Sequence, residues 1–185
     1  MKRFFTLLLL AIFVTGIQAQ QKVTLQDIAQ GTYRAQGISG LKPMLDGEHY
    51  TQISSDHKRI VKYSFKTGEE VGTLFDVTTA RDCDLKSFDD YILSPDEKLI
   101  LIQTETKPIY RHIYNVKNNK MEPLSNNGPQ QVPLFSPDGN QIAFVRNNNI
   151  YLVKLLFGNS ESQVTKDGEY NHVLNGIPDW VYEEE

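Results

Sequence analysis

The sequence predicts an all-β fold assembled from four-stranded antiparallel units. Beyond Gly31, short runs rich in Tyr, Ile, Val, Phe and Thr alternate with clusters of Gly, Asn, Asp and Pro. Those runs lack the extended 3.6-residue apolar period of a helix. A Ser-x-Asp motif also recurs, beginning at Ser54, Ser94 and Ser136, so that successive copies lie 40 and 42 residues apart. This spacing is typical of a β-propeller blade.

The N-terminal residues predict an export signal rather than part of the fold. Lys2 and Arg3 form a basic start, and an almost unbroken apolar stretch follows. That stretch is shorter than the ~20 residues needed to span a bilayer. Small or neutral residues before Gln20 place cleavage after Ala19. We therefore expect a signal peptide at residues 1–19, a propeller segment at residues 20–185, and a periplasmic or secreted mature protein.

A short helical turn is predicted next, from Val23 to Ile28. Thr24 is a good N-cap residue, and Asp27 stands three positions later, as in a capping box. This is the one helical element that the sequence predicts.

Each Ser-x-Asp motif predicts a hairpin. In the copies at Ser94 and Ser136, proline sets φ at the first central position of the turn, and in the copy at Ser136 Asp followed by Gly completes it. Third strands are predicted at residues 61–65, 113–116 and 150–155, and shorter fourth strands at residues 70–75, 121–124 and 163–165. A β-sandwich with coincidental turn motifs is the alternative fold.

Three units are fewer than the four or more blades with which propellers close. An open stack leaves a terminal blade uncovered. We therefore expect a partial β-propeller, about three blades of a larger propeller; the family resemblance given below implies about eight blades in all.

Composition narrows the classes of function. The net charge is −4, without a basic patch dense enough to predict nucleic acid as a partner. Cys83 is the only cysteine, which excludes an intrachain disulfide and a thiolate zinc cluster. The histidines lack the spacing of metal ligands, so neither a metal nor a cofactor is predicted. They are His49, His57, His112 and His172.

Three motifs together resemble one enzyme family. They are Asn175 to Glu185 (NGIPDWVYEEE), Tyr110-Arg111-His112, and Asp46 to Tyr50 (DGEHY). With the Ser-Pro-Asp hairpins, they are similar to the N-terminal β-propeller of bacterial dipeptidyl peptidase IV, a serine exopeptidase of the prolyl oligopeptidase type. The sequence departs from the family in two places: it lacks a stretch after His112, and Pro178 replaces the usual threonine.

The resemblance implies a substrate-binding site. In the family, the last two glutamates of the first motif bind the α-ammonium of a peptide, and the arginine binds a backbone carbonyl near the scissile bond. The matching residues here are Glu184, Glu185 and Arg111. Without the resemblance, the acidic end is read as a solvated terminus and Arg111 as a surface ion pair.

The implied chemistry depends on charge. Neighbouring carboxylates repel each other unless a cation lies between them. An α-amino group, with a pKa of about 8, supplies that cation near neutral pH. An amine held at a fixed distance from a nucleophile makes the enzyme release dipeptides, which in this family are Xaa-Pro dipeptides.

The catalytic part of such an enzyme is not expected in these residues. The family uses an α/β-hydrolase domain with a Ser-Asp-His triad on a G-x-S-x-G elbow. The nearest string, Gly37 to Leu41 (GISGL), lacks the second glycine. The implied partners are a peptide N-terminus, a C-terminal α/β-hydrolase domain and, in the full-length protein, a second copy in a homodimer. A standalone exported TolB-like propeller, acting as a binding or scaffold module, is the alternative function.

Overall fold

The computed structural model describes residues 23–34, 40–104 and 108–178. The chain forms two units, residues 1–39 and residues 40–185, and each is described by itself. The predicted signal peptide lies outside the described residues. Among those that are described, no helix has the length and apolar character needed to cross a membrane.

The first unit contains the helix α2 (Leu25–Ala29). The backbone N–H of Asp27 donates to Thr24 Oγ1 at 3.1 Å, and the N–H of Thr24 donates to Asp27 Oδ2 at 2.9 Å. These reciprocal bonds are the capping box that the sequence predicts.

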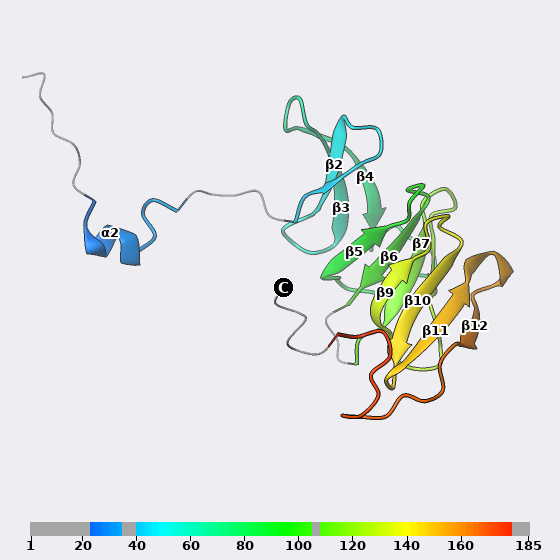
Figure 1. The fold of residues 1–185 in the computed structure, drawn as a ribbon. Helices are drawn as coiled ribbons and strands as arrows, with labels where there is room; N and C mark the ends of the chain where they lie inside the picture. Colours follow the sequence, from blue (N-terminus) through cyan, green and yellow to red (C-terminus); the bar gives the residue numbers. More distant parts are fainter. Residues whose placement is uncertain (1–22, 35–39, 105–107, 179–185) are drawn as a thin grey trace, which may run out of the picture. The chain divides into compact units, whose positions relative to one another are not determined.

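The second unit is all-β, and its described strands form three four-stranded antiparallel sheets, which confirms the predicted fold class. In each sheet the strands are joined in chain order (Figure 1). Sheet A contains β1 (Lys42–Pro43), β2 (His49–Ile53), β3 (Arg59–Ser64) and β4 (Glu70–Asp76); sheet B contains β5 (Asp90–Leu93), β6 (Leu99–Gln103), β7 (Arg111–Asn115) and β8 (Lys120–Pro123); sheet C contains β9 (Gln131–Phe135), β10 (Gln141–Arg146), β11 (Asn149–Lys154) and β12 (Ser160–Gln163), with the 3₁₀-helix η1 (Leu155–Phe157) between the last two.

Sheet B is the middle layer, because both of its faces are apolar and both are covered. Successive side chains of a strand point to opposite faces. In β6, Ile100 and Ile102 pack in one core with residues of sheet A, whereas Leu101 packs in a second core with residues of sheet C. All three are at most 1% exposed. The uninterrupted apolar run of β6 is therefore the pattern of a strand buried on both faces.

Polar contacts also join sheets A and B. The buried hydroxyls of Thr51 and Tyr91 lie 2.6 Å apart, and burial raises the pKa of Tyr91 to about 12. Lys42 forms an ion pair with Asp90 at 2.6 Å, and its Nζ lies 4.2 Å from the centre of the Tyr91 ring. These contacts fix β1 and β2 against the beginning of β5.

The predicted Ser-x-Asp hairpins share one hydrogen-bond pattern. Ser94 Oγ donates to Asp96 at 2.8 Å and accepts from the N–H of Leu99 at 2.9 Å. Ser136 makes the same contacts with Asp138 and Gln141. The fourth turn position has a left-handed backbone, with φ of 57° at Glu97 and 70° at Gly139 in the two turns.

The first Ser-x-Asp turn joins a different pair of strands in its sheet from the pair that the repeat predicts. The Ser54 turn joins the second and third strands of sheet A, whereas the Ser94 and Ser136 turns join the first and second strands of their sheets. The counterpart of those turns in sheet A is the β1–β2 turn, where the N–H of Leu45 donates to Glu97 Oε1 at 2.5 Å. His57 in the Ser54 turn contacts Phe88 at the other end of sheet B instead. Local turn chemistry is the same at both ends of a sheet, so the motif alone does not distinguish them.

We expect Gly139→Ala to lower the free energy of unfolding by about 1 kcal/mol, because a side chain strains a left-handed backbone. Gly72→Ala is the matched control, since Gly72 is extended in β4 and a Cβ there meets nothing within 4 Å. Urea denaturation of both variants measures the difference. Equal losses at the two positions would contradict the strain at Gly139.

Candidate functional site

Arg111 is the first residue of β7 and shares a sheet face with Ile113, which packs toward sheet C. Its backbone N–H donates to Gln130 Oε1 at 2.7 Å, and its carbonyl accepts from the N–H of Leu124 at 2.9 Å. The residue is only 6% exposed. Arg111 is therefore a buried residue held at the junction of two sheets, not the exposed partner of a surface ion pair.

The guanidinium of Arg111 has unused hydrogen-bonding capacity. Its Nη1 is buried and has no hydrogen-bond partner among the described residues. Burial lowers the pKa of Arg111, and the negative charge of Asp90 opposes this effect. An arginine side chain stays protonated near neutral pH even when burial lowers its pKa, so the group remains charged. A buried cationic donor without a partner is costly, so an incoming oxygen acceptor would be bound favourably.

Gln130 connects Arg111 to sheet C. Its side-chain Nε2 donates to the carbonyls of Ser125 and Gly128, and its backbone N–H donates to the carbonyl of Ile109 at 3.1 Å. Gln130 is fully buried and directly precedes β9. Sequence reasoning missed it, because no local pattern indicates that this glutamine is buried.

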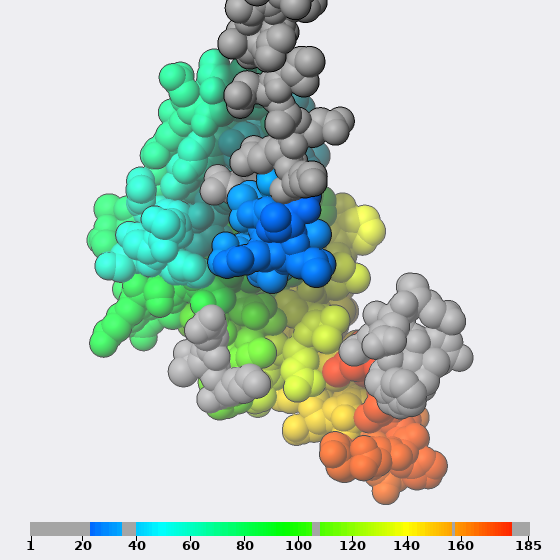
Figure 2. All heavy atoms as spheres, turned by 90° about the vertical axis from the view of Figure 1, so that its left-hand side faces the viewer, coloured from blue at the N-terminus to red at the C-terminus, as the bar shows by residue number. Residues whose placement is uncertain are grey.

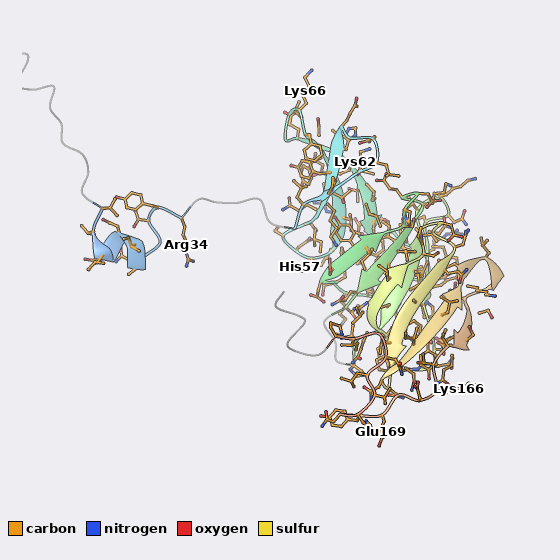
Figure 3. The ribbon with its side chains drawn as sticks, in the orientation of Figure 1. Arg34, His57, Lys62, Lys66, Lys166 and Glu169 are labelled. Atoms are coloured by element: carbon orange, nitrogen blue, oxygen red, sulfur yellow. The ribbon has the colours of Figure 1, made fainter. Side chains whose placement is uncertain are left out.

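The segment that leads to the predicted glutamate pair is fastened to sheet C. We call residues 164–178 the approach segment; Lys166 and Glu169 mark it in Figure 3. It lies against the hairpin end of β10 and β11, where its orange and red spheres contact the yellow ones in Figure 2. The N–H of Asn175 donates to the carbonyl of Asn148 at 3.1 Å. Gly176 packs so closely that a Cβ there would lie 2.9 Å from Val145 Cγ2.

Arg111 and the approach segment meet the same end of neighbouring sheets. Gln130, which binds Arg111, is followed by Gln131, and Gln131 pairs with Val145 of β10. Val145 in turn contacts Gly176. Glu184 and Glu185 lie outside the described residues. The described part of their segment ends at Pro178, at this end of sheet C.

A second buried arginine fixes the connection between sheets B and C. Arg146 forms a two-pronged ion pair with Glu161, and Arg146 Nη1 lies 3.2 Å from Glu161 Oε2. Ser125, in the β8–β9 connection, also donates to Glu161. Burial acts to raise the pKa of Glu161, yet the bonds from Arg146 and Ser125 lower it. The pairing links residues distant in sequence, so the sequence gives no signal of it.

His112 points to the other face of sheet B. Its Nδ1 is buried and has no hydrogen-bond partner in the described part of the chain. Burial lowers the pKa of His112, and the charge of Asp84 opposes this effect. The ring borders a pocket of about 610 Å³ that is lined by Ala80, Asp82, Cys83, Asp84, His112, Glu122 and Pro123. Within residues 23–34, 40–104 and 108–178, no group of three or more His, Cys, Asp or Glu could hold a metal ion.

Comparison with known proteins gives one consistent family. The profile of the dipeptidyl peptidase IV N-terminal region matches residues 94–185. A crystal structure of Porphyromonas gingivalis dipeptidyl peptidase 4 superposes with a TM-score of 0.76 at 40% identity, over 91% of this chain and 25% of that one.

This chain is homologous to the N-terminal region of dipeptidyl peptidase IV.

Two curated relatives are also similar to this chain over half or more of its length. Prolyl endopeptidase FAP from Bos taurus is 33% identical over 173 residues, which cover 88% of this chain and 21% of the relative. A probable dipeptidyl-aminopeptidase B from Emericella nidulans is 44% identical over 104 residues, which cover 50% of this chain and 11% of the relative. The chain thus spans about a fifth of the length of its FAP relative. The three sheets correspond to part of the dipeptidyl peptidase 4 propeller.

The lowered pKa of His112 predicts a pH dependence of stability. The unfolded chain binds a proton on this histidine at a higher pH than the folded chain does, so stability falls as the pH drops below about 6.5. We expect His112→Gln to reduce the loss of melting temperature between pH 7.5 and pH 5.5. Thermal unfolding at the two pH values measures it. His172→Gln, at an exposed position, is the control, and an equal effect there would contradict this role of His112.

Proposed function

We propose that the chain is the N-terminal propeller part of an exported dipeptidyl peptidase that removes Xaa-Pro dipeptides from peptide N-termini. The role of this part of the enzyme is to bind and position the substrate. Arg111 binds a substrate backbone carbonyl, and Glu184 and Glu185 bind the α-ammonium. The observation that carries the proposal is the buried guanidinium of Arg111, whose Nη1 lacks a partner among the described residues.

The position of Arg111 supports this role. An oxygen acceptor that reaches Nη1 would satisfy a donor that is shielded from water, which makes a charge-assisted hydrogen bond stronger. The approach segment meets the same end of the neighbouring sheet through Gly176 and Val145. A peptide held by its amine on one side and its carbonyl on the other would have a fixed register. A fixed register restricts cleavage to one distance from the N-terminus.

The anchor can be tested on this chain without a catalytic domain. Three charge-assisted contacts, offset by the entropic cost of association, predict a dissociation constant on the order of millimolar, so NMR titration is the suitable measurement. We expect Gly-Pro-Gly with a free amine to shift resonances near Arg111 and Asn175, and N-acetyl-Gly-Pro-Gly to bind more weakly. Binding should weaken above about pH 8, where the ammonium deprotonates.

Variants separate the residues of the anchor. Glu184→Gln, Glu185→Gln and Arg111→Met should each weaken binding of the free-amine peptide roughly tenfold, the loss of one charge-assisted bond. Glu183→Gln is the matched control, because the third carboxylate has no assigned contact. Equal binding of the acetylated peptide, or an equal effect at Glu183, would rule out the amine anchor.

The genomic reading frame that encodes this chain gives a separate test. We expect the gene to continue beyond Glu185 with further propeller blades and a G-x-S-x-G elbow. A stop codon directly after Glu185 in the genomic sequence would refute the peptidase proposal and leave a propeller segment with another role.

A further inference from the structure

Asn149 occupies in sheet C the position that Arg111 occupies in sheet B. Each is the first residue of the third strand of its sheet, and each pairs with the last residue of the preceding strand. Asn149 is only 7% exposed. A buried amide needs partners for its oxygen and its nitrogen, and Asn149 finds them on two different segments.

Most of its bonds reach the approach segment. The side-chain Oδ1 accepts from Thr165 Oγ1 at 3.1 Å and from the backbone N–H of Gly168 at 3.0 Å. The Nδ2 donates to the carbonyl of Asn147 at 3.1 Å. Thr165 Oγ1 also accepts from the N–H of Ile150 at 2.9 Å. One side chain therefore links the β10–β11 turn to the beginning of the approach segment.

The backbone around this contact is closely packed. A Cβ on Gly168 would lie 2.3 Å from the carbonyl oxygen of Asn148. Further along, Asn175 bonds to the same carbonyl group of Asn148, and Gly176 packs on Val145 and Ile150. The segment thus leaves the sheet at Gly168 and returns to it at Asn175, both times at the β10–β11 turn.

We propose that Asn149 is a positioning residue for the amine-binding site. It fastens the approach segment to the end of sheet C that adjoins Arg111, and so sets where the chain departs toward Glu184 and Glu185. The inference rests on the proposed function for its substrate, a peptide with a free N-terminal amine. Asn149 itself does not touch the peptide.

The test uses the complete 185-residue chain with Asn149→Ala and Asn149→Asp. The Ala variant leaves Gly168 and Thr165 without their acceptor, whereas the Asp variant keeps it. We expect Asn149→Ala to speed amide hydrogen exchange at Asn175 and to weaken binding of free-amine Gly-Pro-Gly, each roughly tenfold, the effect of one lost buried acceptor. Asn149→Asp should restore most of both. Exchange at Phe144, in the centre of β10, should stay unchanged.

Asn118→Ala is the matched control, because Asn118 is an exposed asparagine in the β7–β8 turn. Unchanged exchange at Asn175 in Asn149→Ala would overturn the proposal. An equal weakening of peptide binding in Asn118→Ala would also overturn it. Faster exchange at Phe144 as well would show general destabilisation and also overturn it. Equal binding of free-amine and acetylated peptide by the unaltered chain would instead overturn the proposed function. Exchange at Asn175 is measured without peptide, so the two failures are distinguishable.

Discussion

Burial of both faces of sheet B is the constraint on which the second unit depends. A strand with apolar side chains on both faces is stable only between two covering layers. In β6, Ile100 and Ile102 require sheet A on one side, and Leu101 requires sheet C on the other. Each of these side chains contributes roughly 1.5–3 kcal/mol of transfer free energy when buried. The apolar run from Leu99 to Ile102 is therefore consistent with the place of sheet B between sheets A and C (Figure 1).

The same layering accounts for the burial of Arg111. It stands two residues before Ile113 on the face that packs toward sheet C, so closure of that core removes its guanidinium from water. A buried cation is expensive unless its donors are satisfied. Arg146 meets this requirement through Glu161, whereas Nη1 of Arg111 has no partner among the described residues. The contrast between two buried arginines of neighbouring sheets distinguishes a structural residue from a candidate binding residue.

Much of the fold could be predicted from the sequence, and much of the site could not. Strand periodicity and turn residues are local, so the strands of sheets B and C and the capping box at Thr24 were predictable. Turn residues also report only local structure, which explains why the place of the Ser54 turn was predicted wrongly. The chemistry of such a turn suits either end of a sheet. The resemblance singled out Arg111, but not its burial. Gln130 and Asn149 were missed because their partners lie on segments that only the folded chain brings together.

On the proposed function, the substrate register depends on packing between sheets rather than on any one motif. Arg111 belongs to sheet B, whereas the approach segment is bound to sheet C through Asn149 and Gly176. The distance between Arg111 and the glutamate pair is then set by the core between those sheets, which contains Leu101 and Phe144. Close-packed cores transmit small displacements instead of absorbing them. A change in that core would therefore shift Arg111 relative to the glutamate pair, although no core residue touches the peptide.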